Sequence, residues 1–91
     1  MNKAYVVDGE TMRIVEADKL QKGMIVEYAP AWRAEGEEKY IHVITDMWEN
    51  DGHEFVKIST INTNIVFGST EVVWAEMIQP ADIEKVNAIG R

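Results

Sequence analysis

The dipeptide Asp51-Gly52 is the feature that most constrains how this chain folds. A two-residue hairpin turn of type I′ requires a positive φ angle at both central residues, and Asp-Gly is one of the few pairs that adopt it readily. Residues 39–47 and 53–60, on either side of the pair, are rich in β-branched and aromatic side chains. These segments therefore predict two antiparallel strands whose connecting tip is Asp51-Gly52.

The two-residue turn also fixes the register of the two strands. The predicted facing pairs are Asn50–His53, Trp48–Phe55, Met47–Val56, Asp46–Lys57 and Thr45–Ile58. The aromatic pair and the opposite-charge pair stabilise the hairpin by about 0.2–1 kcal/mol each. The side chains that face the core in this register are Ile41, Val43, Thr45, Met47, Val56, Ile58 and Thr60. Glu49 then faces Glu54, so a three-residue loop with a bulge at Gly52 stays open as an alternative.

The stretch from Thr45 to Phe55 contains four carboxylates and a histidine, which raises the question of a metal site. In the predicted hairpin His53 lies at the tip, whereas His42 lies about eight residues back, or roughly 26 Å away at the rise of an extended strand. The acids also lack the spacing of a calcium loop, which alternates its ligands and ends on a distal glutamate. We therefore expect no metal ion and no cofactor.

Short β-branched and aromatic runs separated by glycine and proline continue along the whole chain. In the strand predicted over residues 24–28, alternation places Glu27 outside and Met24, Val26 and Tyr28 inside. After Pro80, Ile83, Val86 and Ile89 recur every three residues, which predicts a short C-terminal helix. The strands expected in addition to the central hairpin are residues 4–7, 12–16, 24–28, 65–67 and 71–78. The aromatics expected to be buried or half-buried in strands are Tyr5, Tyr28, Phe67 and Trp74.

This pattern predicts a mainly β fold in a single domain over residues 1–91. We expect a small SH3-like barrel or a strongly bent antiparallel sheet of five to seven strands, with a short C-terminal helix. The stretches Leu20-Gln21-Lys22-Gly23-Met24-Ile25-Val26 and Val72-Val73-Trp74-Ala75-Glu76-Met77-Ile78-Gln79-Pro80 resemble those of an SH3-like small barrel. The paired tryptophans and the acidic first loop of peptide-binding SH3 domains are not present. Because such barrels serve many functions, the resemblance implies none.

The charge pattern restricts the class of partner. Sixteen acids and nine bases give a net charge of −7, and no two basic residues are adjacent. Because nucleic-acid binding begins with clustered Lys and Arg on phosphates, we expect no direct nucleic-acid partner. No apolar run approaches the length of about 18 residues that spans a bilayer, and Asp8 comes too early for a signal peptide. The absence of cysteine fits the same picture, and we expect a cytoplasmic protein without a membrane partner.

Catalytic motifs are not evident in the sequence. It lacks a Gly-x-Ser-x-Gly elbow and a glycine-rich phosphate loop, and we expect a non-enzymatic protein. The one constellation that favours an enzymatic or small-molecule domain is Tyr40, His42 and Asp46, which the predicted strand places on one face. His42 itself fits a histidine on the strand surface.

The longest predicted loop, residues 29–38, is the strongest candidate for a functional segment. It contains Trp32 and Arg33, residue types that are enriched at the energetic centre of protein interfaces. The predicted partner-binding residues are Tyr28, Trp32, Arg33, Tyr40 and Trp48, with an acidic rim of Glu35, Glu37 and Glu38. We expect Trp32 to be partly exposed and Arg33 to pair with an acid or a carbonyl of the partner. The competing interpretations are that Trp32 folds back over the domain, that Trp48 packs only on Phe55, and that the acids are simply solvated.

The sequence thus predicts an interaction module that binds a protein partner through an aromatic loop. The alternative is a small acidic inhibitor from a phage or mobile element that occupies a basic nucleic-acid-binding groove, which the acidic middle third of the chain motivates. The two differ in salt dependence, because screening weakens an acidic mimic more than a tryptophan-anchored contact. Self-association into a homo-oligomer is left open.

Overall fold

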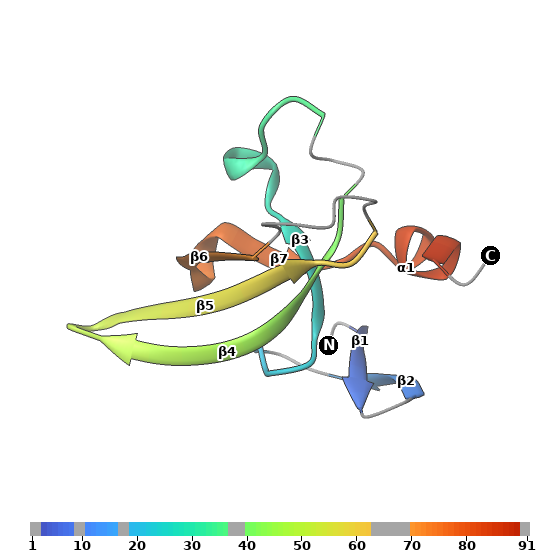
Figure 1. Cartoon of the computed structure of the whole chain (residues 1–91), viewed down its shortest axis with the longest axis horizontal. Coiled ribbons are helices and arrows are strands. Elements are labelled where there is room, and N and C mark those ends of the chain that lie inside the picture. The colour runs from blue at the N-terminus through green and yellow to red at the C-terminus, as the bar shows by residue number, and fades with distance from the viewer. Residues whose placement is uncertain (1–2, 9–10, 17–18, 37–39, 63–69, 90–91) are drawn as a thin grey trace.

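The computed structural model describes residues 3–8, 11–16, 19–36, 40–62 and 70–89. Within these residues, seven strands form a five-stranded antiparallel sheet of order β6-β5-β4-β3-β7 and a two-stranded sheet of β1 and β2 (Figure 1). The elements are β1 (Lys3–Asp8), β2 (Thr11–Glu16), β3 (Ile25–Tyr28), the 3₁₀ turn η1 (Pro30–Trp32), β4 (His42–Asn50), β5 (His53–Thr60), β6 (Thr70–Trp74), the 3₁₀ turn η3 (Ala75–Met77), β7 (Ile78–Pro80) and α1 (Ile83–Ile89).

The predicted mainly β fold with a short C-terminal helix is confirmed. Within the described part of the chain, β6 and β7 form opposite edges of the large sheet, so the sheet is bent but not closed into a barrel. The strand predicted over residues 65–67, together with Phe67, lies outside the described residues. None of the described helices has the length and apolar content needed to cross a membrane.

The central hairpin has the predicted two-residue turn. Asp51 has a φ of 55° and Gly52 a φ of 80°, the two positive values that a type I′ turn needs. The pairs Asn50–His53, Trp48–Phe55, Met47–Val56 and Asp46–Lys57 all occur as predicted. The alternative three-residue loop is therefore wrong, and Glu49 does face Glu54 at an exposed position near the tip.

The predicted register is wrong beyond Asp46, because a β-bulge interrupts β4 at Thr45. Ile44, and not Thr45, pairs with Ile58, and Thr45 is an extra, exposed residue whose hydroxyl donates to the carbonyl of Lys57 at 3.2 Å. An extra residue reverses the alternation of side chains. The bulge therefore separates Ile41 and Val43 from Met47, which the sequence placed on one face. The bulge instead brings Ile44 onto the face of the first cluster, the face that Met47 also packs against.

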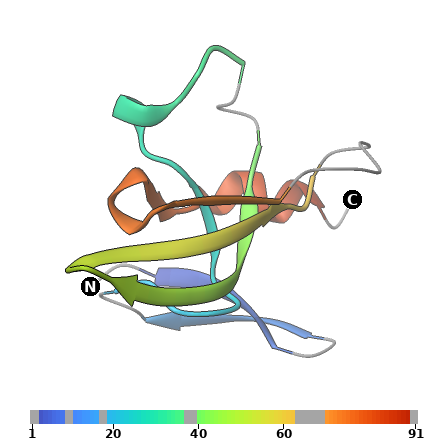
Figure 2. The ribbon, with the colours of Figure 1, turned by 60° about the vertical axis from the view of Figure 1, so that its left-hand side comes forward.

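Two hydrophobic clusters lie on the two faces of the large sheet. The first contains Ala4, Val6, Met24, Val26, Tyr28, Ile44, Val56, Ile58, Val73 and Ile78. The second is smaller and contains Ile25, Ile41 and Val86, with Tyr5, Ile61 and Ala81 packed against it. Val86 brings helix α1 onto the second face, and Figure 2 shows α1 and the hairpin of β1 and β2 lying against different parts of the sheet. Strand β3 is buried along its whole length because both faces are covered there.

The predicted strand over residues 71–78 is in fact two strands separated by η3. Strand β6 pairs with β5 at one edge of the sheet, whereas β7 pairs with β3 at the other. The turn η3 redirects the chain between these edges, and its Ala75 and Met77 pack against the first cluster. A single straight strand could not pair with both β5 and β3, because these strands lie on opposite sides of β4. The interruption at η3 allows residues 70–74 to pair with β5 and residues 78–80 to pair with β3.

Besides Thr45, three side chains differ from their predicted environment. Glu27, predicted to point outward, is 6% exposed, and His42, predicted on the surface, is also 6% exposed. Glu27 is buried because residues 79–85 cover the face that alternation assigned to solvent, and His42 because the bulge turns it toward the first cluster. Trp74, predicted to be core or half-buried, is 42% exposed.

Candidate functional site

All three tryptophans of this chain are exposed. The exposed fractions are 46% for Trp32, 38% for Trp48 and 42% for Trp74. Tryptophan is on average a well buried residue, yet the two clusters here are built almost entirely from aliphatic side chains, Met24 and Tyr28. Exposed indoles combine a large apolar surface with one polar N–H, and such surfaces are enriched where proteins contact partners.

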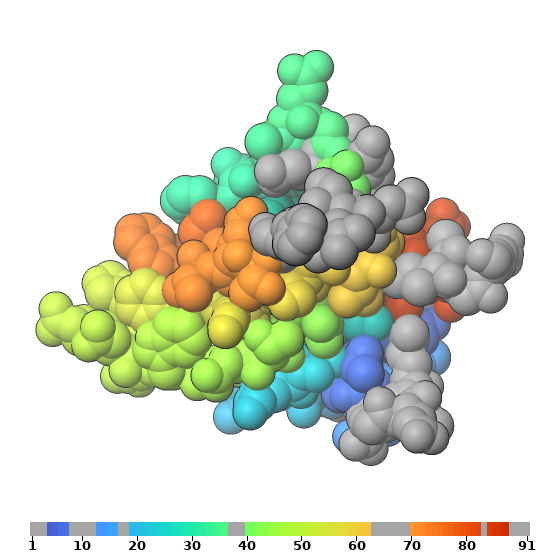
Figure 3. Space-filling model, viewed as in Figure 1, coloured from blue at the N-terminus to red at the C-terminus, as the bar shows by residue number. Residues whose placement is uncertain are grey.

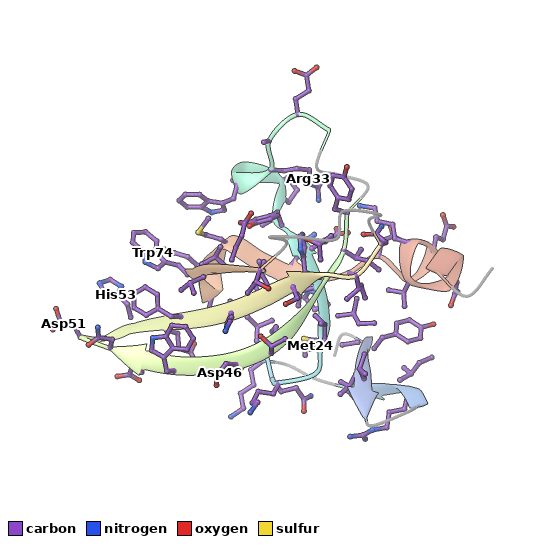
Figure 4. The ribbon with its side chains drawn as sticks, viewed as in Figure 1. Met24, Arg33, Asp46, Asp51, His53 and Trp74 are labelled. Atoms are coloured by element: carbon purple, nitrogen blue, oxygen red, sulfur yellow. The ribbon has the colours of Figure 1, made fainter. Side chains whose placement is uncertain are left out.

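Two of these tryptophans belong to a continuous set of rings across three strands. Trp48 on β4 faces Phe55 on β5, and Phe55 faces Trp74 on β6. The rings of Trp48 and Phe55 are nearly parallel, with 6.0 Å between centroids and 14° between planes. The ring of His53 stacks on Trp74 at 5.8 Å and 13°. We call Trp48, Phe55, Trp74 and His53 the aromatic row. Figure 4 shows His53 and Trp74 beside each other near the tip marked by Asp51.

The aromatic row occupies the uncovered end of the second sheet face. Phe55, Lys57 and Ser59 alternate on the same side of β5. Ser59 faces Val43, and Val43 faces Ile25, which lies beneath helix α1. The helix therefore covers one end of this face and leaves the hairpin end bare. Val72, which faces Lys57 between the two ends, is 55% exposed.

A hollow of about 300 Å³ adjoins the aromatic row where β6 leaves the sheet. Strand β6 ends at Trp74, opposite Phe55, whereas β5 continues to His53 at the turn. The residues that line the hollow are Gly52, His53, Glu54, Trp74, Ala75 and Glu76. Figure 3 shows the hairpin tip in yellow-green and the β6–η3 segment in orange next to each other at the left end of the molecule.

The surroundings of the aromatic row are acidic. Between residues 45 and 57 the chain has four acids, Asp46, Glu49, Asp51 and Glu54, and one base, Lys57. All five side chains are exposed. Glu76 adds a further exposed carboxylate at the hollow. Asp46 shares the side of the hairpin that carries Trp48, whereas Glu49 and Glu54 alternate to the other side, so the negative potential surrounds the hairpin as a whole.

Trp32, predicted to be partly exposed, lies on η1 next to this surface. The backbone N–H of Ala29 donates to the carbonyl of Met77 at 2.9 Å, which holds the start of η1 against the end of η3. Trp74 is the last residue of β6, directly before η3, so the loop that carries Trp32 is attached to the segment that follows Trp74. Figures 1 and 2 both show η1 on the side of the sheet edge formed by β6 and η3.

Arg33 is turned toward the interior of its own chain. Its Nη2 donates to the carbonyl of Tyr28 at 2.9 Å and lies 3.3 Å from Oε1 of Glu27. The guanidinium thus pairs with an acid and a backbone carbonyl, the two kinds of group that the sequence assigned to a partner. In the free protein Arg33 anchors the loop that carries Trp32.

Glu27 is the centre of a buried polar cluster that the sequence did not predict. Its carboxylate accepts hydrogen bonds from Lys85 at 2.9 Å, Gln79 at 3.1 Å and the backbone N–H of Asp82 at 3.4 Å. Burial raises the pKa of Glu27, but these hydrogen bonds and the charge of Lys85 together hold it below its ordinary value of 4.5. The cluster connects β3, β7, α1 and the Trp32 loop, so its role is to fix these elements together.

The other predicted site residues are distributed as follows. Tyr28 is 7% exposed and its hydroxyl donates to the carboxylate of Glu71, so it belongs to the core beneath the surface. Tyr40 is half-buried before β4, and Glu35 is exposed beside Gly36 on the loop. Glu37 and Glu38 lie outside the described residues.

The residues that favoured an enzymatic or metal site are not brought together. His42 faces the first cluster, where its Nδ1 lies 2.9 Å from the hydroxyl of Thr60 and its ring meets the edge of Tyr28. Asp46 lies on the opposite face because of the bulge at Thr45. In the described part of the chain, no group of three or more His, Asp or Glu side chains is arranged to hold a metal ion.

The sequence provided a signal for only half of the aromatic row. The Asp51-Gly52 turn predicts that Trp48 faces Phe55, but no short turn sets the register between β5 and β6. Comparison with known proteins adds no further guide: no protein-family model, curated protein or solved structure matches this chain.

Proposed function

We propose that this protein is a non-enzymatic interaction protein that binds a protein partner through the aromatic row and the neighbouring Trp32. The observation that carries the proposal is the exposure of all three tryptophans, two of which flank Phe55 on the bare end of a sheet face. Trp is the residue type most often found among the few that dominate binding energy. The proposal extends the predicted loop site, since it keeps Trp32 and Trp48 and adds Phe55, Trp74 and His53.

The rigidity of the surface supports a binding role. The row lies on three paired strands, and stacking restricts the rings further. Rings that are already ordered lose little conformational freedom when a partner covers them, so more of the contact energy appears as affinity. Trp32 is held in the same way, because Arg33 and the hydrogen bond between Ala29 and Met77 anchor its loop.

The alternative function is a small acidic inhibitor that occupies a basic nucleic-acid-binding groove. The exposed acids of the hairpin and Glu76 favour it. In that case the carboxylates supply most of the affinity, and binding falls steeply as salt screens them. If the partner instead binds through the aromatic row, the rings supply most of the affinity. Removing one ring then weakens partner binding more than neutralising one acid does.

The test is to isolate the partner from the source cells, identify it, and measure its affinity for a series of variants. We expect Trp74→Ala and Trp32→Ala each to weaken binding by about 2 kcal/mol or more, as hot-spot residues do. The matched control is Ile14→Ala, which removes a side chain that is 51% exposed on the distant strand β2 and is expected to leave affinity unchanged. Sedimentation of the isolated protein at rising concentration is measured in parallel.

Three results contradict the proposal. Equal losses for Trp74→Ala and Ile14→Ala exclude the row as the contact surface. Unchanged affinity for both tryptophan variants, combined with a steep salt dependence, favours the acidic inhibitor. A dimer of wild type that Trp74→Ala dissociates identifies a second copy as the occupant of the row.

A further inference from the structure

The hollow beside Trp74 combines an exposed aromatic face with unbalanced negative charge. Two acidic residues, Glu54 and Glu76, are among the residues that line it, and none of these is a lysine or arginine. The ion pairs observed among the described residues join Arg33 and Lys85 to Glu27, which lies beneath the other end of the sheet face. The two carboxylates at the hollow therefore remain available to a cation from outside.

An indole ring favours the same kind of ligand. The face of an aromatic ring carries negative electrostatic potential and attracts cations within about 6 Å, with tryptophan the strongest of the aromatic residues. His53 stacks against Trp74 with 5.8 Å between ring centroids, and Trp74 nevertheless remains 42% exposed, so part of the indole is open to solvent. Aromatic surface and acidic rim thus select for positive charge together.

Arginine fits this site better than lysine does. A guanidinium group is planar, so it can stack on an indole while its N–H groups point outward in the ring plane to carboxylates. An ammonium group is compact and strongly hydrated, and it cannot make both contacts with the same geometry. The residues that line the hollow of about 300 Å³ include one acid from β5, Glu54, which alternates to the opposite side of the strand from Phe55, and one acid from η3, Glu76, so the two acids approach the hollow at the sheet edge from different elements.

We infer that the aromatic row receives a basic segment of the partner protein, with an arginine side chain stacked on Trp74 between Glu54 and Glu76. This inference rests on the proposed function and names the chemistry of its partner. Nucleic acid is disfavoured as occupant, because phosphates would meet the acids of the hairpin. A second copy of the chain is disfavoured as well, since each copy has a net charge of −7 and brings the same acidic rim to the contact.

The test uses the full chain labelled with ¹⁵N and three short glycine-spaced peptides that contain two arginines, two lysines or two citrullines. Citrulline has the shape of arginine without its charge. The readout is the indole N–H resonance of each of the three tryptophans during titration. We expect the Trp74 resonance to shift most, with affinity highest for the arginine peptide, lower for the lysine peptide and absent for the citrulline peptide.

Variants separate specific binding from general attraction. Trp74→Ala is expected to lower affinity for the arginine peptide by about two- to fivefold, as loss of an exposed cation–π contact does. The double variant Glu54→Gln/Glu76→Gln is expected to lower it as well and to flatten its salt dependence between about 20 and 300 mM. The control Glu16→Gln/Glu84→Gln makes the same change in net charge at exposed positions on β2 and α1, and is expected to bind like wild type.

Each other outcome overturns the inference. A Trp74 resonance that stays in place up to about 10 mM arginine peptide, a range that covers weak single-contact affinities, excludes the arginine site. If the citrulline peptide binds as tightly as the arginine peptide, the site does not require positive charge. If both double variants lose the same affinity for the arginine peptide, the net charge of the protein alone explains the binding. If the arginine site fails while Trp74→Ala still weakens binding of the natural partner, the proposed function stands without it. If both fail, the row is not a binding surface.

Discussion

The second face of the large sheet has two ends that differ in what covers them. At one end Val86 of helix α1 packs on Ile25 and Ile41, and Lys85 pairs with the buried Glu27. At the other end Trp48 and Trp74 are exposed. Strand β5 presents alternate side chains to this face at both ends, from Phe55 to Ser59, so its pattern does not decide which end is covered. The difference lies in the segment that follows β7, because α1 packs on Ile25 and Ile41 and lies on the side of the molecule away from the hairpin tip (Figure 1).

The two ends of this face should therefore contribute to different properties, one to the stability of the fold and the other to partner binding. The covered end contains aliphatic side chains and a satisfied polar cluster, whereas the bare end contains large rings that already lie in a fixed arrangement. Substitutions at the covered end should therefore lower the free energy of unfolding, and those at the bare end should lower partner affinity.

The largest effect is expected at Ile25. This side chain is completely buried between β3 and α1, and Ile25→Ala should lower the free energy of unfolding by about 2–5 kcal/mol, through lost burial and the cavity that remains. The measurement is urea unfolding followed by circular dichroism. A loss below about 1 kcal/mol, typical of surface positions, would show that α1 does not close the core at this end.

Glu27→Gln is expected to lower the free energy of unfolding by about 2 kcal/mol at pH 7, because an amide cannot replace the charge that Lys85 and Arg33 face. The pKa of the native carboxyl lies below its ordinary value, so the ionised group contributes its full stabilisation above about pH 4.5. That contribution is lost as the pH falls through the native pKa.

Urea unfolding of wild type and Glu27→Gln should therefore differ most at neutral pH, and the gap should shrink as the pH falls below about 4.5. Glu84→Gln, an exposed acid on the same helix as Lys85, is the matched control and should show a small gap at every pH. A constant gap between wild type and Glu27→Gln across this range contradicts a stabilising charge at Glu27.

Gly52→Val should destabilise the protein by more than about 1 kcal/mol, because a β-branched side chain resists the positive φ of 80° at this position. No described atom lies within 4 Å of the place where a Cβ would stand, so the cost arises from the backbone conformation alone. Gly52→Asn, which tolerates positive φ, should be nearly neutral. Coincident urea curves for the valine variant and wild type would refute the turn and, with it, the placement of the aromatic row.

The smallest effect on stability is expected at the bare end. Trp74→Ala should change the free energy of unfolding by less than about 1 kcal/mol, as expected outside the core. Trp32→Ala should behave in the same way, since its side chain is 46% exposed. Tryptophan fluorescence of wild type should show the emission of solvated indoles and shift to the blue when the partner binds. A loss of several kcal/mol for either variant would make the rings structural and remove the contrast between the two ends.

Part of the candidate site follows from local sequence and part does not. Trp48 faces Phe55 because the Asp51-Gly52 turn fixes the neighbouring register within a few residues. Trp74 joins them through pairing of β6 with β5, and nine residues, 61–69, separate these strands in the sequence, too many for a two-residue turn to set the register. The exposure of Trp32 could be predicted from its place in a loop with Pro30 and Gly36. The inward orientation of Arg33 could not, because it depends on an ion pair with Glu27, and Glu27 is buried by residues distant in sequence.

The sequence by itself determined the tip of the central hairpin, the register of its first pairs, the mainly β class and the C-terminal helix. Each of these features depends on the backbone preferences of a few residues or on the repeat of apolar side chains over a short segment. Residues that are adjacent in sequence are sufficient to define both. The tertiary structure alone decided the bulge at Thr45, the burial of Glu27 and the exposure of Trp74. These depend on which distant segment covers each sheet face: the bulge places Ile44 and Met47 on the face of the first cluster, and α1 covers Ile25 and leaves the aromatic row bare.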